Sequence, residues 1–218
     1  MTYRTEFHCH TLYSKDSLVS PACLVQACRK KKIDRVIITD HNSIEGALEA
    51  QRIAPDLVIV GEEIMTTKGE ILAAFVTEEI PAMLSPLETI RRLRAQGAFI
   101  SISHPFDFTR SGHWQKADLL EILPQIDAIE TFNARCLLPR MNRQAQEFAR
   151  RHGIASTVGS DAHTLFELGR ATLMLPQFKS GSELRAVIQQ GIPQMRGTGI
   201  HARVASRYAV LHKKICKK

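Results

Sequence analysis

The stretch VIITDHN, from Val36 to Asn42, is a run of apolar and β-branched residues that changes abruptly to three polar ones. A short run of this kind predicts a buried strand. The change of character places Asp40 and His41 just past its carboxyl end. The same pattern recurs along the chain, and it is typical of barrels in which functional side chains follow the strands.

The pattern predicts eight strands separated by helical segments, an order that indicates a mainly parallel sheet. The predicted strands are Glu6–Cys9, Arg35–Thr39, Leu57–Val60, Ile71–Val76, Ala98–Ser103, Ala128–Phe132, Ala155–Gly159 and Ala171–Leu175. The third and fourth are close enough in sequence to form a hairpin.

Two helices are expected to begin at Ser-Pro pairs, because serine caps a helix and proline fits its first position. These pairs are Ser20-Pro21 and Ser85-Pro86, and Gly97 is expected to end the second helix. Further helices are predicted over Ile44–Ile53, Gln115–Leu123, Leu138–His152 and Ser182–Gln190, with Gly153 after the third of these. No G-x-G-x-x-G turn follows the first strand, which favours an α/β barrel in a single domain over an open nucleotide-binding sheet.

The composition is that of a globular protein, with 218 residues, 44% hydrophobic and 23% charged. No run approaches the roughly 20 apolar residues of a membrane span, and the amino-terminal residues do not resemble a signal peptide, so a cytoplasmic location and no membrane partner are expected. The five cysteines are scattered and are interpreted as reduced thiols: Cys9, Cys23, Cys28, Cys136 and Cys216.

The formal net charge of +7 favours anionic partners. Part of this charge lies in residues 201–218, which contain no acid after Arg203 and are expected to be a solvated basic tail beyond a domain of residues 1–200.

Five of the nine histidines lie at the end of a predicted strand or just past it: His8, His10, His41, His104 and His163. His8 and His10 share a face of the first strand because side chains alternate along a strand. A pair of histidines alone is a weak signal. Together with Asp16, Glu63 and Asp161, the five histidines offer both nitrogen ligands and negative charge, which indicates a metal centre.

In this combination the chain resembles the polymerase-and-histidinol-phosphatase (PHP) superfamily of metal-dependent phosphoesterases. The resemblance rests on motifs that occur in the family's order: His8-x-His10, Asp16, Thr39-Asp40-His41, Gly61-x-Glu63, Ser103-His104-Pro105 and Gly159-Ser160-Asp161-x-His163. It implies a distorted seven-stranded βα barrel, similar to a TIM barrel, that holds two or three divalent ions of zinc, manganese or iron.

The resemblance also implies how the ligands divide among the ions. A first metal would be held by His8, His10, Glu63 and Asp161, and a second by Glu63 and His104. Asp16, His41 and His163 would hold the third. Where many relatives have a histidine on the fourth strand, this chain has Glu70, which is either a substitute ligand that favours manganese or iron, or an ordinary charge of the hairpin.

Such a site would hydrolyse a phosphate ester, because paired cations about 3.5–4 Å apart activate water and hold the attacking and leaving oxygens. The expected nucleophile is a hydroxide bridging the first two ions, with Glu63, Asp161 and His163 as catalytic residues. Substrate phosphate is expected at arginines, whose planar group matches it, with Asn133 as an orienting residue or a helix cap. The candidate arginines are Arg110, Arg135 and Arg170. Asp40 and Glu62 are expected to support the ligands or the fold.

The expected substrate is a phosphomonoester such as a sugar phosphate, histidinol phosphate or nucleotide bisphosphate. The alternatives are a nuclease or phosphodiesterase acting on short nucleic acid, a metal-stabilised accessory module without activity, and an amidohydrolase, which also opens with H-x-H.

Overall fold

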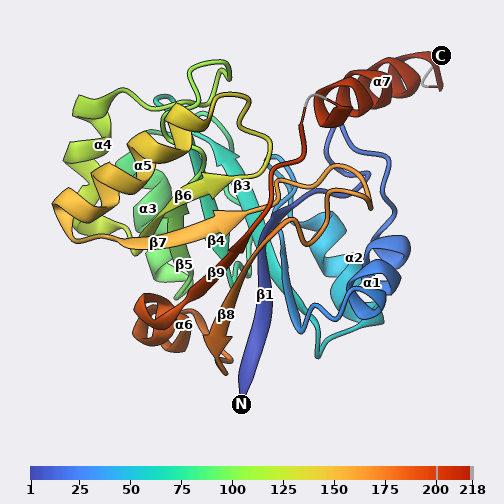
Figure 1. The fold of residues 1–218 in the computed structure, drawn as a ribbon, viewed down its shortest axis with the longest axis horizontal. Coiled ribbons are helices and arrows are strands. Elements are labelled where there is room, and N and C mark those ends of the chain that lie inside the picture. Colours follow the sequence, from blue (N-terminus) through green and yellow to red (C-terminus); the bar gives the residue numbers. More distant parts are fainter. Residues whose placement is uncertain (200, 217–218) are drawn as a thin grey trace.

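The computed structural model describes residues 1–199 and 201–216, apart from the side chains of residues 201–203 and 216. Its centre is one sheet that curves into a nearly closed barrel (Figure 1). The strands are β1 (Thr2–Cys9), β2 (Arg35–Ile38), β3 (Val58–Met65), β4 (Glu70–Ala74), β5 (Phe99–Ile102), β6 (Ala128–Asn133), β7 (Ala155–Gly159), β8 (Ala171–Pro176) and β9 (Ile192–Met195).

The strands follow the order β7-β6-β5-β4-β3-β2-β1-β8-β9. The β1-β2-β3 and β5-β6-β7 groups are parallel, whereas β4 pairs antiparallel to both of its neighbours. The expected hairpin of β3 and β4 is therefore confirmed. The barrel nearly closes beside the end of β1, where Cys9 forms a parallel bridge to Ala162 after β7.

The described sheet has nine strands, so the expected number of seven is wrong. The excess comes from β8 and β9, which extend the sheet beyond β1 as antiparallel strands. Strand β9 was not predicted, because Ile192-Pro193-Gln194-Met195 is exposed throughout and lacks the alternation that marks a half-buried strand. Pro193 is tolerated because β9 is an edge strand.

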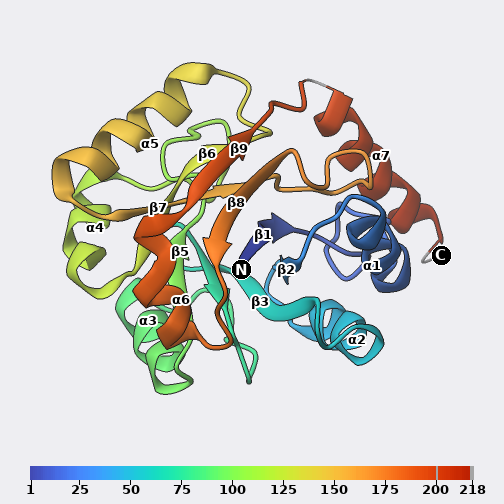
Figure 2. The same ribbon diagram turned by 60° about the horizontal axis from the view of Figure 1, so that its bottom comes forward.

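Helices surround the barrel on two sides, with α1 and α2 on one and α3, α4 and α5 on the other (Figures 1 and 2). They are α1 (Pro21–Lys30), α2 (Glu45–Ile53), α3 (Pro86–Ala95), α4 (Lys116–Ile122), α5 (Pro139–His152), α6 (Gly181–Val187) and α7 (His201–Cys216), with 3-10 turns at Leu123–Gln125 and Ile188–Gln190. Strand β2 shows how the core is divided: Val36 and Ile38 belong to the cluster that includes helix residues such as Leu24, and Ile37 joins Phe7 and Phe99 in a second cluster.

The helix ends follow the predicted local chemistry. Ser20 and Ser85 each accept a hydrogen bond from a backbone N–H of the first turn, of Cys23 and Glu88 respectively. Gly97 and Gly153 both have positive φ angles, of 76° and 64°, at the ends of α3 and α5. Glycine occupies such positions without strain, which explains why both helices stop there.

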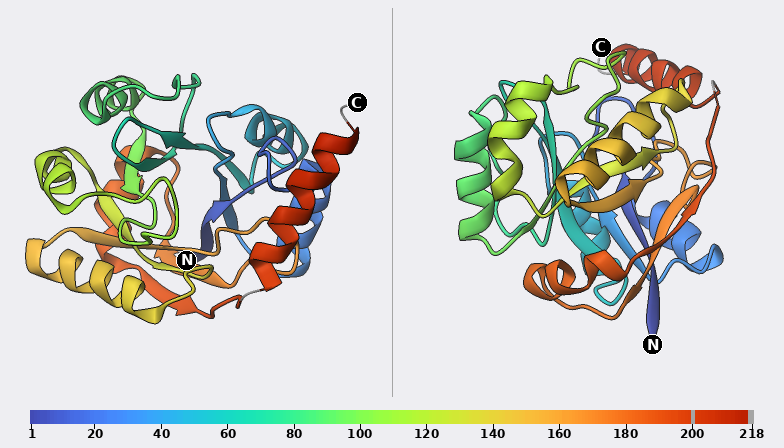
Figure 3. Two further views of the ribbon diagram at one scale, coloured as in Figure 1. Left: turned by 90° about the horizontal axis from the view of Figure 1, so that it is seen from above. Right: turned by 60° about the vertical axis from the view of Figure 1, so that its left-hand side comes forward.

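The stretch expected to be a basic tail forms α7, which lies along one side of the molecule, beside the loop that follows β1 (Figure 3). Its Lys213 donates to the carbonyls of Leu12 and Ser14, and Arg207 and Lys214 are exposed. The other basic residues of this stretch, Arg203, Lys217 and Lys218, lie outside the described side chains, as do His201 and Cys216. Cys9, Cys23, Cys28 and Cys136 are free thiols.

None of the helices in the described residues combines the length and the apolar character that a membrane crossing requires.

Candidate metal centre

The histidines and carboxylates singled out in the sequence gather at one end of the barrel. Most follow a parallel strand, and carboxyl ends of parallel strands lie at the same edge of a sheet. Glu70 reaches the same edge for another reason: it begins β4, which runs in the opposite direction. The structure brings all nine expected ligands into one contiguous cluster, through contacts that join His8, His10, Asp16, His41, Glu63, Glu70, His104, Asp161 and His163.

Glu63 is at the centre of the cluster. Its Oε2 atom lies 3.3 Å from His8 Nε2, 3.4 Å from His10 Nε2 and 3.0 Å from His41 Nδ1. The atom is buried, yet it makes no hydrogen bond. Three imidazole nitrogens surround this oxygen, and none of them forms a hydrogen bond with it. This is the arrangement expected where a cation would lie between the nitrogens and the oxygen.

Asp161 repeats this arrangement on the other side of His10. Its Oδ1 atom lies 3.7 Å from His8 Nε2, 3.4 Å from His10 Nε2 and 3.4 Å from His163 Nδ1, and it too is buried without a hydrogen bond. Its Oδ2 atom instead accepts from Asn133 and Arg110. One oxygen of this carboxylate is therefore held by the protein and the other remains available to an ion.

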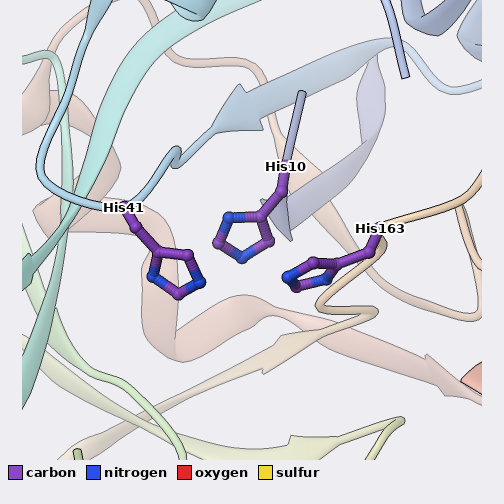
Figure 4. A group of neighbouring side chains, drawn as sticks. All are labelled: His10, His41 and His163. Carbon is purple, nitrogen blue, oxygen red and sulfur yellow. The ribbon is translucent and has the colours of Figure 1, made fainter. Parts of the chain in front are cut away.

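His10, His41 and His163 form a group of imidazoles that converge (Figure 4). Their ring centroids are 4.5 Å apart for His10 and His41 and 4.1 Å apart for His10 and His163. Asp16 is beside them, with its Oδ2 atom 3.1 Å from His163 Nε2 and its Oδ1 atom 3.7 Å from His41 Nε2. Asp16 Oδ1 and His163 Nε2 are also buried atoms without a hydrogen bond.

Glu70 and His104 complete the cluster opposite. The Glu70 carboxylate lies 3.4 Å from His104 Nε2 and 3.8 Å from His41 Nδ1. A loop encloses it, because Glu70 N donates to the Gly112 carbonyl and the Trp114 indole donates to the Glu70 carbonyl. Glu70 is thus a buried member of the cluster beside His41 and Glu63, a position that suits a substitute ligand better than an ordinary charge of the hairpin.

The residues fit a group of divalent cations. Three sets of side chains each place their ligand atoms within 4.8 Å of one another: His8, His10 and Glu63; His10, His41 and His163; and His41, Glu63 and Glu70. Imidazole nitrogen and carboxylate oxygen are ligands that zinc, manganese and iron accept. Such ions would contact buried atoms that make no hydrogen bond, among them Glu63 Oε2, Asp161 Oδ1, Asp16 Oδ1 and His163 Nε2.

The pKa values of the neighbouring histidines His8 and His10 are shifted in opposite directions. Burial and the charges of His163 and His41 hold the pKa of His10 well below its usual value. Burial also acts on His8, but the carboxylates of Glu63 and Asp161 outweigh it and hold the pKa of His8 well above its usual value. His8 must therefore lose a proton before its nitrogen can bind a cation, which makes cation binding dependent on pH.

Two of the three arginines predicted to bind substrate lie in the cluster, and the third does not. Arg110 Nη1 lies 2.6 Å from Asp161 Oδ2, and Arg135 Nη1 lies 2.6 Å from His163 Nδ1, so both belong to the cluster. Asn133 donates to Asp161 and Glu130 instead of capping a helix through its side chain. Arg170 is not brought to the cluster: it stacks on the Phe166 ring and lines another cavity.

The structure adds a residue that the sequence reasoning missed. Glu130 in β6 is buried, accepts from the His104 backbone N–H at 2.9 Å and lies 2.9 Å from His8 Nδ1. It therefore orients the imidazole whose other nitrogen faces Glu63, a common arrangement around metal sites. The available signal was an acid within the apolar run Ala128–Phe132.

Asp40 supports the cluster, whereas Glu62 supports the fold. Asp40 accepts from Thr11 and Ser14, and Ser14 lies 3.0 Å from His10 Nδ1, so Asp40 acts on the cluster through one intermediate residue. Glu62 points away and accepts from the backbone of Ile80, which makes it part of the fold.

Two members of the cluster have backbone conformations that are uncommon for residues with side chains. His104 has a φ of 23° and Asp161 a φ of 52°. Such conformations persist where the surroundings fix them, and they occur often at functional sites. Here they turn two side chains inward just after β5 and β7.

Comparison with known proteins agrees with this geometry. The sequence profile of the PHP domain matches residues 6–122, and that of a PHP-associated region matches residues 139–192. An uncharacterised protein of Methanocaldococcus jannaschii is 38% identical over 171 residues, which cover 77% of this chain and 68% of that protein.

Several solved structures have a similar fold. One is a two-domain protein from Bacteroides vulgatus that contains a predicted PHP-like metal-dependent phosphoesterase; its TM-score is 0.73 at 18% identity, over 90% of this chain. The match spans 65% of that longer protein. Another is PsfC from Pseudomonas syringae, with a TM-score of 0.71 at 15% identity over 97% of this chain and 98% of that one.

Proposed function

Because the chain belongs to the PHP domain family, we propose that it is a metal-dependent hydrolase of phosphomonoesters that uses two or three divalent cations. The observation that carries the proposal is the pair of buried oxygens, Glu63 Oε2 and Asp161 Oδ1. Each is surrounded by imidazole nitrogens and makes no hydrogen bond. Burying ionised oxygens in this way is costly unless they are paired with positive charge, which cations would supply.

The cluster opens to solvent on one side. The side chains of Asp16, His41 and Arg110 are each 20% exposed, whereas those of the other proposed ligands are at most 9% exposed. A substrate would therefore approach past these three residues. A terminal phosphate reaches such a recessed site more easily than a phosphate within a polymer, which supports a monoester as substrate.

When bound, divalent cations would lower the pKa of water and offset the charge of the phosphate oxygens. The protein's own residues would hold the substrate beside them. Arg110 is fixed by Asp107 and Asp161, so its guanidinium is oriented before substrate binds. Asn133 holds one Asp161 oxygen, which leaves the other directed at the histidines. Preorganised groups of this kind stabilise charge in the transition state without first having to reorient.

The experiment measures bound metals and phosphate release by the purified protein, before and after chelation, on small phosphomonoesters and on short RNA. His104→Ala and Asp161→Asn are expected to lower phosphate release by roughly a hundredfold or more. His152→Ala is the matched control, because His152 is exposed on α5 and stacks on Phe148 away from the cluster.

Full activity in the chelated protein would refute the proposal. Cleavage of RNA without release of phosphate from small monoesters would replace the monoester with a diester as substrate.

A further inference from the structure

A second cavity lies outside the metal centre and is lined by four cationic side chains. It has a volume of about 820 Å³ and is bounded by β1, the end of α1, the loop before β8 and the end of β9. The cationic side chains are Arg4, Lys31, Arg170 and Arg196, and none of the lining residues is acidic. Arg170 is the arginine that the sequence predicted as a phosphate ligand and that the metal centre does not use.

Two of these cations hold the cavity in shape. Arg4 donates to the carbonyls of Lys31 and Gly169, and Lys31 donates through Nζ to the carbonyls of Leu165 and Leu168. These bonds fix the loop of residues 165–170 against β1 and α1. The loop is fixed from its other side by Glu6, which accepts from the Gly169 N–H.

The other two cations remain available to a ligand. Among the residues that the structure describes, Arg170 and Arg196 have no acidic partner, and their guanidinium groups make no hydrogen bond. Arg170 lies with its guanidinium 4.3 Å from the centre of the Phe166 ring. This contact holds the arginine by a cation–π interaction and leaves its N–H groups free.

Like charges this close together repel one another. The pKa of Lys31 is lowered, mainly by burial and further by the charges of Arg170 and Arg4. An anion bound between the arginines would relieve the repulsion. Guanidinium groups present paired donors that match the oxygens of a phosphate.

We propose that this cavity is a second anion site that binds the phosphate group of a small molecule, independently of the metal centre. Arg170 and Arg196 would donate to the phosphate oxygens. The ring of Phe166 is 65% exposed and would offer a surface to a nucleobase. The phosphate is therefore either free or part of a nucleotide. The inference does not rest on the proposed hydrolysis, because no ligand of the metal cluster lines this cavity.

The test counts phosphate sites on the metal-loaded protein by titration calorimetry with inorganic phosphate. Two sites per chain are expected, one in each region, and the double variant Arg170→Gln/Arg196→Gln should retain one. Its affinity for phosphate in the cavity should fall by roughly tenfold or more for each guanidinium lost. Arg52→Gln is the matched control, because Arg52 is exposed on α2, outside the cavity.

The result separates the two proposals. If the metal centre does not bind phosphate, the wild type has one site and the double variant none. An equal loss in Arg52→Gln, or no loss in the double variant, would overturn the inference, because only a diffuse surface charge would then be acting.

A second titration distinguishes the sources of the phosphate. The non-hydrolysable α,β-methylene adenosine diphosphate should bind the cavity more tightly than inorganic phosphate if the base stacks on Phe166. Phe166→Ala should then abolish the difference between the two ligands. Because the ring also holds Arg170, phosphate binding itself should weaken, but by less than in the double variant. Equal affinities in the wild type would identify free phosphate as the ligand.

Discussion

Glu130 is the residue whose role can be tested most directly, because it contacts the cluster without facing the proposed ions. Glu130→Gln keeps the shape but weakens the contact with His8 Nδ1 and with Asn133. We expect the affinity for metal to fall by roughly 10- to 100-fold, as for other orienting carboxylates. Metal titration measures it, with Glu147→Gln on the exposed face of α5 as control. Unchanged affinity would show that His8 needs no such partner.

Glu70 bears on metal preference. A carboxylate is a harder ligand than imidazole, so Glu70→His should shift the bound metal from manganese or iron toward zinc. The measurement is the metal content after loading with an equimolar mixture, determined by mass spectrometry. Glu78→His, an exposed change nearby in sequence, should leave the ratio unaltered. The same ratio in both variants would contradict a ligand role for Glu70.

Glu62 gives the fold a pH dependence of its own. Burial raises its pKa from 4.5 to about 8. The folded chain therefore holds this proton more tightly than the unfolded chain does, and stability falls as pH rises from about 4.5 to about 8. Glu62→Gln removes the effect, so its Tm should exceed that of the wild type by several degrees at pH 8 and match it near pH 4.5.

Thermal unfolding at both pH values measures this difference. Glu121→Gln, on the exposed face of α4, is the control and should follow the wild type. A difference in Tm between Glu62→Gln and the wild type that stays constant across the range would contradict the assignment.

At the residue scale, the sequence identifies the members of the cluster because most of them lie near the end of a strand or just after it. It does not identify Glu130, since a single acid inside a strand predicts neither its partner nor the direction of its side chain. It misplaces Arg170 for a related reason: the arginine follows the His163 loop in sequence, but that loop turns away from the cluster.

At the scale of elements, Gly153 shows that local chemistry ends a helix. Its φ of 64° suits glycine, and a Cβ there would meet no atom within 4 Å. Gly153→Ala should therefore cost only backbone strain, about 1 kcal/mol of the free energy of unfolding, with unchanged phosphate release. Chemical denaturation measures it. A cost near zero would mean that α5 ends for another reason.

Elements with caps and buried faces were predicted well, and elements without them were missed. Ser20, Ser85, Gly97 and Gly153 mark helix ends in the sequence as they do in the structure. Strand β9 has no buried face, so no hydrophobic pattern marks it. The basic charge of residues 201–218 predicts a solvated tail, whereas in the structure Ser206 of α7 contacts Arg135 and Ala209 is buried.

At the scale of the whole molecule, the cluster links strands across most of the sheet, from β1 to β7 in the strand order. Ions that bind only the folded chain should stabilise all of it, by about 2.7 kcal/mol at a hundred times the dissociation constant. Chelation should lower the Tm by roughly 5–10 °C for a chain of this size. Differential scanning calorimetry measures the Tm before and after chelation. In the His104→Ala variant, chelation should lower the Tm by less than in the wild type. A Tm that ignores chelation would argue against a structural link through the ions.

The barrel closes beside the cluster, between β1 and the loop after β7. Two backbone hydrogen bonds join its edges, from His10 N to the Ala162 carbonyl and from Ala162 N to the His8 carbonyl. Both hydrogen bonds lie between residues of the cluster, so ion binding that stabilises the cluster should also slow hydrogen exchange at the amides of His10 and Ala162. Their exchange rates would then report ion binding beside this seam, in a protein whose substrate need not be known.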